Sequence, residues 1–174
     1  MEAAGRPRVP HLEVAFTPRI ERMAFPHSEE NTASRLRLQA LVGRLSDEDL
    51  ALSTPYGWTV AAILAHLAWW DQRVLALLRR WKEDGVDESP IDSHAVNDAL
   101  RPLCHAIDPG KAIELCLSSA EAVDAELETI SYDLMKQVEG TTSTQFRFNR
   151  ALHRNDHLND IEALLRPQHN CGGA

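Results

Sequence analysis

The feature that most limits the fold is a long apolar stripe between residues 59 and 84. Thr59 can cap the start of a helix here, and Gly85 can end it. The apolar residues recur every three or four positions, which is the spacing of one helix face. They are Ile63, Leu67, Trp70, Val74, Leu77, Leu78 and Trp81. A helix of this kind is stable when its stripe packs against other helices.

Three further segments carry apolar residues at helical spacing, and we predict long helices from about 28 to 45, 109 to 130 and 149 to 166. Ser28 and Asp108 are expected to cap the first two. A shorter helix is predicted over 93–105, kinked or shortened by Pro102. Tyr132 to Val138 is either helical or irregular, and the residues after Gly140 are turn-like.

No alternating run is long enough to build a sheet, so the predicted fold is all-α. Four long amphipathic helices make a four-helix bundle, with a short extra helix between the second and third. We divide the chain into an N-terminal arm (1–27), the bundle (28–167) and a C-terminal tail (168–174).

Composition narrows the class of partner. The formal net charge of −8 argues against nucleic acid, because the phosphates would be repelled. No apolar run reaches the roughly 20 residues that cross a bilayer, and the N-terminus lacks the order of a secretory signal. The three cysteines are odd in number and form no Cys-x-x-Cys pair, which favours a reducing compartment. We therefore expect a cytoplasmic protein that binds a small molecule, without a membrane or nucleic-acid partner.

A constellation of histidines is the strongest functional signal. His153 and His157 are four residues apart, so a helix places both imidazoles on one face, one turn apart. His66 lies in the apolar stripe of the 59–84 helix. Three imidazoles on facing helices can hold one zinc, nickel or iron ion. The alternative is that each is a structural histidine bonded to a carbonyl or a carboxylate.

Two common metal-enzyme mechanisms do not fit. A zincin protease needs His-Glu-x-x-His, but Arg154 follows His153. A di-iron carboxylate bundle needs Glu-x-x-His motifs, and none lies beside His66 or His153. Three histidines leave a coordination position open, which is typical of a catalytic site.

Two segments resemble the DinB-like (YfiT-like) superfamily. One begins at Gly57 and reads GWTVAAILAHLAWWD, and the other begins at His153 and reads HRNDHLNDI. The resemblance covers about residues 29 to 165. It implies an up-down-down-up bundle, a divalent metal held by His66, His153 and His157, and frequently a homodimer. It also implies a thiol-dependent S-transferase or isomerase that uses a low-molecular-weight thiol, or a metal-dependent hydrolase.

Further residues are candidates for contact with the substrate or the ligands. Arg150 and Arg154 flank the histidine pair and could attract an anionic cofactor or substrate. Asp71 and Asp156 could orient the imidazoles by accepting hydrogen bonds. Aromatic residues could line a pocket, namely Tyr56, Trp58 and Trp69. The alternative functions are a non-catalytic bundle that binds a metal, a small molecule or a partner, and a stress protein that sequesters a toxic compound.

Overall fold

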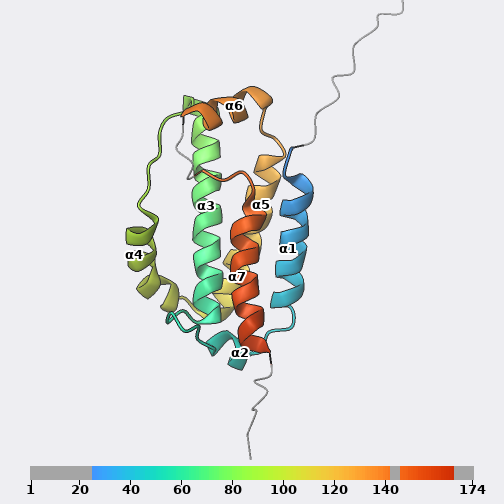
Figure 1. Ribbon diagram of the computed structural model, residues 1–174, viewed down its shortest axis with the longest axis vertical. Coiled ribbons are helices and arrows are strands. Elements are labelled where there is room, and N and C mark those ends of the chain that lie inside the picture. Colours follow the sequence, from blue (N-terminus) through green and yellow to red (C-terminus); the bar gives the residue numbers. More distant parts are fainter. Residues whose placement is uncertain (1–24, 142–145, 167–174) are drawn as a thin grey trace, which may run out of the picture.

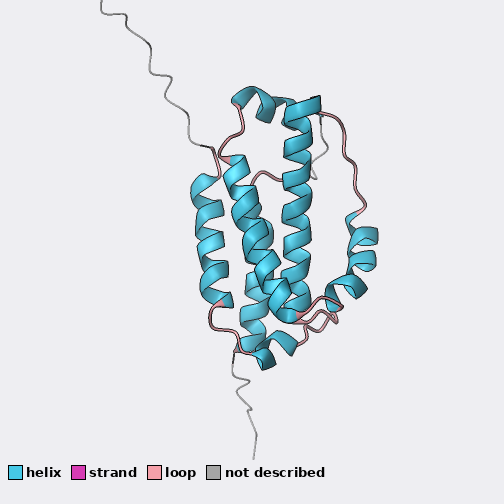
Figure 2. Cartoon of the chain, turned by 180° about the vertical axis from the view of Figure 1, so that it is seen from behind, coloured by secondary structure: helices cyan, strands magenta, loops and turns pink. Residues whose placement is uncertain are grey.

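A computed structural model describes residues 25–141 and 146–166 of the 174-residue chain (Figure 1). Four long helices surround one core: α1 (Ser28–Val42), α3 (Val60–Asp84), α5 (Pro109–Leu127) and α7 (Arg150–Leu165). The described residues contain helices, turns and loops but no strand longer than a single bridge (Figure 2). The predicted all-α helical bundle is therefore confirmed.

Hydrogen bonds between helices fix their directions. The α3 side chains Gln72 and Lys82 bond to Ser119 and Glu126 of α5. The later residue of α3 bonds to the later residue of α5, so the two helices run in the same direction. Figure 1 shows α1 and α7 running the opposite way, which gives the up-down-down-up order. Parallel neighbours require a long connection, and residues 85–108 supply it.

Local capping explains where three of the helices begin. Oxygen atoms of Thr59, Asp108 and Asn149 accept hydrogen bonds from backbone N–H groups three residues further on, at the starts of α3, α5 and α7. Gly85 ends α3 at φ +90°, a backbone conformation that favours glycine. For α1 the predicted cap is wrong by one residue, because His27 is the N-cap, without a side-chain cap bond, and Ser28 is already helical.

Three short helices connect the long ones: α2 (Asp47–Ala51), α4 (Ser93–His105) and α6 (Tyr132–Thr141). The α4 bounds are those predicted, and the helix continues through Pro102. The segment from Tyr132 is helical, and it includes Gly140, which was expected in a turn. Figures 1 and 2 show α4 beside α3, on the outside of the bundle. Most of the predicted arm (1–24), residues 142–145 and the tail (167–174, with Cys171) lie outside the described residues.

The core consists of two apolar clusters with a charged layer between them. On α3, the first cluster ends at Ala68 and the second begins at Val74, and Asp71 lies between. Asp124 of α5 and Arg154 of α7 occupy the same layer, and all three charged residues are buried. Buried charges require partners of opposite sign, so this layer demands a specific alignment of the helices.

Ion pairs in this layer join all four long helices. Arg154 donates through Nη2 to Asp71 Oδ2 at 3.0 Å and to Asp124 Oδ1 at 2.8 Å. Arg150 Nε donates to Asp71 Oδ1 at 2.8 Å. Arg35 Nε of α1 donates to Asp124 Oδ2 at 3.1 Å. We call these five residues the buried ionic layer.

Candidate metal centre

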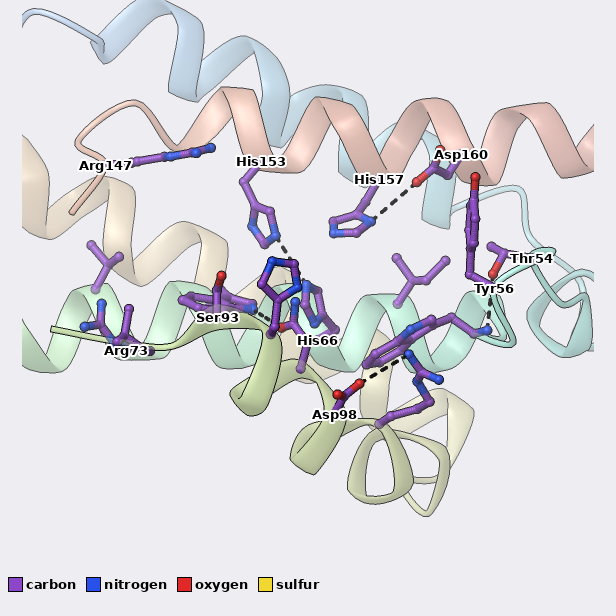
Figure 3. A pocket seen from close by; sticks show the side chains of 18 of the residues that line it. Thr54, Tyr56, His66, Arg73, Ser93, Asp98, Arg147, His153, His157 and Asp160 are labelled. Carbon is purple, nitrogen blue, oxygen red and sulfur yellow. Dashed lines mark hydrogen bonds and ion pairs between the residues drawn. The ribbon is translucent and has the colours of Figure 1, made fainter. Parts of the chain in front are cut away.

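Three imidazoles converge where α3 faces α7. His66 comes from α3, and His153 and His157 come from successive turns of α7 (Figure 3). Nε2 of His66 lies 3.3 Å from Nε2 of His153. One nitrogen from each residue lies within 4.8 Å of the other two. The structure thus brings together the three histidines that the sequence predicted as ligands.

Burial keeps these imidazoles neutral at physiological pH. It lowers the pKa of His66 to about 3, assisted by the charge that His157 would carry. Burial also lowers the pKa of His153 to about 2, and Arg150 adds to this effect. The pKa of His157 is lowered by burial too, although Asp160 and Asp156 oppose the shift. Neutral imidazoles have free lone pairs, which is the form that binds a metal.

The histidines lack the partners that structural histidines would have. Nδ1 of His66 and Nδ1 of His157 are buried and find no hydrogen-bond partner among the described residues. A buried polar atom without a partner is costly. The imidazoles instead face one another, with ring centroids 4.9–5.3 Å apart. This arrangement does not match three histidines that each bond to a carbonyl or a carboxylate.

The donor set fits a metal ion. Two nitrogens bound to one tetrahedral zinc at about 2.0–2.1 Å lie roughly 3.3–3.4 Å apart. The Nε2 atoms of His66 and His153 are separated by 3.3 Å. Three neutral nitrogens on rigid helices would leave one tetrahedral position open toward the pocket.

Aromatic rings cover the imidazoles. Trp58 stands edge-on to His66, with ring centroids 5.2 Å apart. Trp70 lies 6.2 Å from the His66 ring and 6.1 Å from the His153 ring. Trp70 lines the pocket and was expected in the core, whereas Trp69 packs against the apolar core and is not among the pocket residues. The sequence analysis had placed Trp69 at the pocket and Trp70 in the core, and the structure shows the reverse.

The predicted arginines have different surroundings. Arg150 lines the pocket. Arg154 is completely buried, and its guanidinium bonds Asp71 and Asp124. Arg154 therefore lies away from any incoming anion, because the ionic layer encloses it. Asp71 likewise accepts hydrogen bonds from the two arginines and not from an imidazole.

A carboxylate that the sequence analysis missed lies closest to His157. Asp160 Oδ2 is 3.7 Å from Nδ1 of His157, beyond direct hydrogen-bond length. The predicted partner, Asp156, is exposed and acts on His157 only through its charge. Asp160 lies three residues after His157, a spacing that places both side chains on neighbouring parts of one helix face.

The imidazoles open into a pocket of about 580 Å³ between α3, α7 and α4. This volume suits a small molecule. The sequence analysis missed the wall that α4 contributes, which includes Asn97, Asp98 and Arg101. Tyr56 and Trp58, two of the candidate substrate contacts, line the same pocket from the loop before α3. Arg101 lies over the Trp58 ring, 5.3 Å from its centroid.

Comparisons with known proteins give one result. The family model of the DinB superfamily matches residues 30–162. No curated protein and no solved structure gives a significant match. Separately, none of the helices in the described part of the chain is long and apolar enough to span a membrane.

Proposed function

Since this chain belongs to the DinB superfamily, we propose that it is a metal-dependent enzyme that acts on a small molecule. His66, His153 and His157 would hold one divalent ion of zinc, nickel or iron. The observation that carries this proposal is the convergence of three neutral, inward-facing imidazoles on one point at the bottom of a pocket.

The ion would make a thiol or a water at its open position more nucleophilic. A low-molecular-weight thiol fits this scheme, because none of the residues that line the pocket is a cysteine. Trp58 and Trp70 would exclude bulk water from the imidazoles. Tyr56, from the loop before α3, and Arg150, from α7, would both contact the substrate. An S-transferase, isomerase or hydrolase reaction is compatible with these roles.

The test is elemental analysis of protein purified without a histidine tag and dialysed against a weak chelator. We expect about one metal ion per chain. His153→Ala should lose most of this metal, because two nitrogens hold an ion far less tightly than three. His94→Ala is the matched control, since His94 lines the same pocket outside the three ligands.

A wild-type protein that is folded, metal-free and unable to take up zinc or nickel would contradict the proposal. The non-catalytic binding bundle would then explain the pocket better. Stoichiometric capture of a small molecule without turnover would favour the sequestration protein.

Asp160 should tune the metal affinity through His157. We expect Asp160→Asn to weaken zinc binding about tenfold, because a nearby carboxylate orients the imidazole and increases its basicity. Asp156→Asn, on the same helix, should have a smaller effect. Competition with a chromogenic zinc chelator measures both. Equal losses in the two variants would show that only their charge matters.

Two further properties stay predictions. Assembly as a homodimer is in keeping with exposed leucines on α1 and α7, namely Leu36 and Leu152. A cytoplasmic location is in keeping with Cys104 and Cys116, which are buried free thiols.

A further inference from the structure

We propose that Arg73, Arg147 and Arg150 form an anion subsite at one end of the pocket, which holds a carboxylate or phosphate group of the substrate. The inference rests on the proposed function, because it assigns the polar end group of the molecule that would react beside the three histidines. All three arginines line the pocket.

The first argument is the charge of the buried ionic layer. Its three guanidinium groups, from Arg35, Arg150 and Arg154, face the carboxylates of Asp71 and Asp124. One positive charge is therefore left without a counter-charge in this layer. A buried excess charge is costly, and a bound anion would offset that cost.

The second argument is that the excess charge reaches the pocket through Arg150. This residue is only 4% exposed, and its Nε is used by Asp71. Its Nη2 is buried and has no hydrogen-bond partner among the described residues. A charged donor in this state is suited to an oxyanion, which accepts short, strong hydrogen bonds from guanidinium groups.

Arg73 adds a second cation, which forms no ion pair with a carboxylate in the described part of the chain. Its Nη2 donates to the backbone oxygen and to Oγ of Ser89, both at 3.0 Å and both uncharged. Burial lowers the pKa of Arg73, and the neighbouring charges of Arg150 and Arg80 lower it further. Like charges held together in this way are stabilised by an anion between them.

Arg147 completes the subsite from the opposite wall. Figure 3 shows Arg147 beside α7 and Arg73 on α3, both at the end of the pocket nearer His153. Arg147 and Arg150 both contribute to the low pKa of His153. Their charges therefore act on the space next to the proposed metal ligands.

The carboxylates of the pocket lie toward the other end. Asp160 is beside His157, and Asp98 pairs with Arg101 at 3.7 Å. Figure 3 shows both carboxylates on the side of Tyr56 and away from Arg73 and Arg147. The pocket is thus polarised, although the whole chain has a net charge of −8. An anionic substrate would be oriented with its charged group at the arginines and its reacting group at the histidines.

The test is binding of small oxyanions to the full-length protein after chelator treatment and dialysis, so that no metal competes for the anion. Succinate and inorganic phosphate are titrated separately, with uncharged succinamide as the control ligand. Tryptophan fluorescence reports binding, because Trp58 and Trp70 line the pocket. We expect succinate or phosphate to bind, succinamide not to bind, and affinity to fall as salt is added.

Arg73→Gln and Arg147→Gln should each weaken binding about tenfold, the loss expected for one charged hydrogen bond. Arg79→Gln is the matched control, since Arg79 lies on α3 but pairs with Glu126 on the surface. Arg150→Lys keeps the positive charge in the ionic layer. It should still weaken binding, because lysine lacks the planar guanidinium group that can bond an oxyanion through two N–H donors. Circular dichroism confirms that each variant is folded.

Equal binding of succinate and succinamide, or unchanged affinity in a folded Arg73→Gln/Arg147→Gln double variant, would overturn the subsite. These outcomes leave the metal proposal intact, because metal content is measured independently. Conversely, a protein that binds succinate at the arginines but takes up no metal would retain the subsite and refute the proposed enzyme.

Discussion

Replacing Arg154 by methionine should lower the free energy of unfolding by about 3–5 kcal/mol, a large part of the stability of a domain of this size. Methionine fills much of the same volume but leaves two buried carboxylates, Asp71 and Asp124, without their shared cation. Burial lowers the pKa of Arg154, but these two carboxylates outweigh that effect and raise it. The arginine is therefore charged, and its loss removes the four hydrogen bonds that it donates to the two carboxylates. Urea denaturation followed by circular dichroism measures the change.

The control for this experiment is Arg37→Met on α1. Arg37 also reaches α7, through Asn155, Asn159 and Glu162, but it is partly exposed. Its loss should cost at most about 1 kcal/mol. Equal losses in the Arg154 and Arg37 variants would refute the importance of the buried layer.

Acidification should destabilise the metal-free protein by about 3–4 kcal/mol between pH 6.5 and pH 5. The folded-state pKa values of His66 and His153 are about 3 and about 2, below the unfolded value of 6.5. As pH falls below 6.5, these two imidazoles become protonated in the unfolded chain but stay neutral in the folded protein. The stability is therefore complete above pH 6.5 and is lost progressively down to about pH 3.

Urea denaturation at a series of pH values, with the protein metal-free, checks this prediction. His153→Ala should reduce the slope of stability against pH, because one of the two main titrating groups is removed. His94→Ala should keep the wild-type slope, since His94 is exposed on α4. A wild-type slope in His153→Ala would show that groups other than the imidazoles cause the acid sensitivity.

The helices and the three converging histidines could be predicted because they depend on local periodicity. Capping residues such as Thr59 and Asp108 bond to backbone N–H groups only three residues further along the chain, so a short stretch of sequence is enough to predict them. His153 and His157 share a helix face through their spacing alone, and the apolar stripe turns His66 inward. Each of these inferences needs only the geometry of a single helix.

The position of the tryptophans could not be decided in this way. Relative to His66, Trp69 is rotated by about 60° in one direction around the helix and Trp70 by about 40° in the other. Both therefore lie close to the imidazole, and the neighbouring helix decides which one lines the pocket. That helix is α4, where Asn97 Oδ1 accepts a hydrogen bond from Nε1 of Trp70 at 3.3 Å.

The ionic layer was missed because its pairs join residues that are distant in sequence. Arg154 and Asp71 are 83 positions apart. A helical wheel could nevertheless have shown that Asp71 does not lie beside His66. Asp71 is rotated by about 140° from His66 and so faces a different side of α3. Asp160 is about 60° from His157, and Asp156 is about 100° away, which favours the carboxylate that the structure places nearer.

The placement of α4 separates two tasks within one small protein. The bundle fixes the histidines through α3 and α7, whereas α4 packs beside α3 and contributes pocket residues such as Asn97 and Asp98. Only Leu100 and Cys104 of α4 are buried in the apolar core. Mutations on the exposed turns of α4 can therefore change the shape and charge of the pocket wall while the arrangement of the three histidines is preserved. A scaffold of this kind can change its pocket over evolution at little risk to its stability.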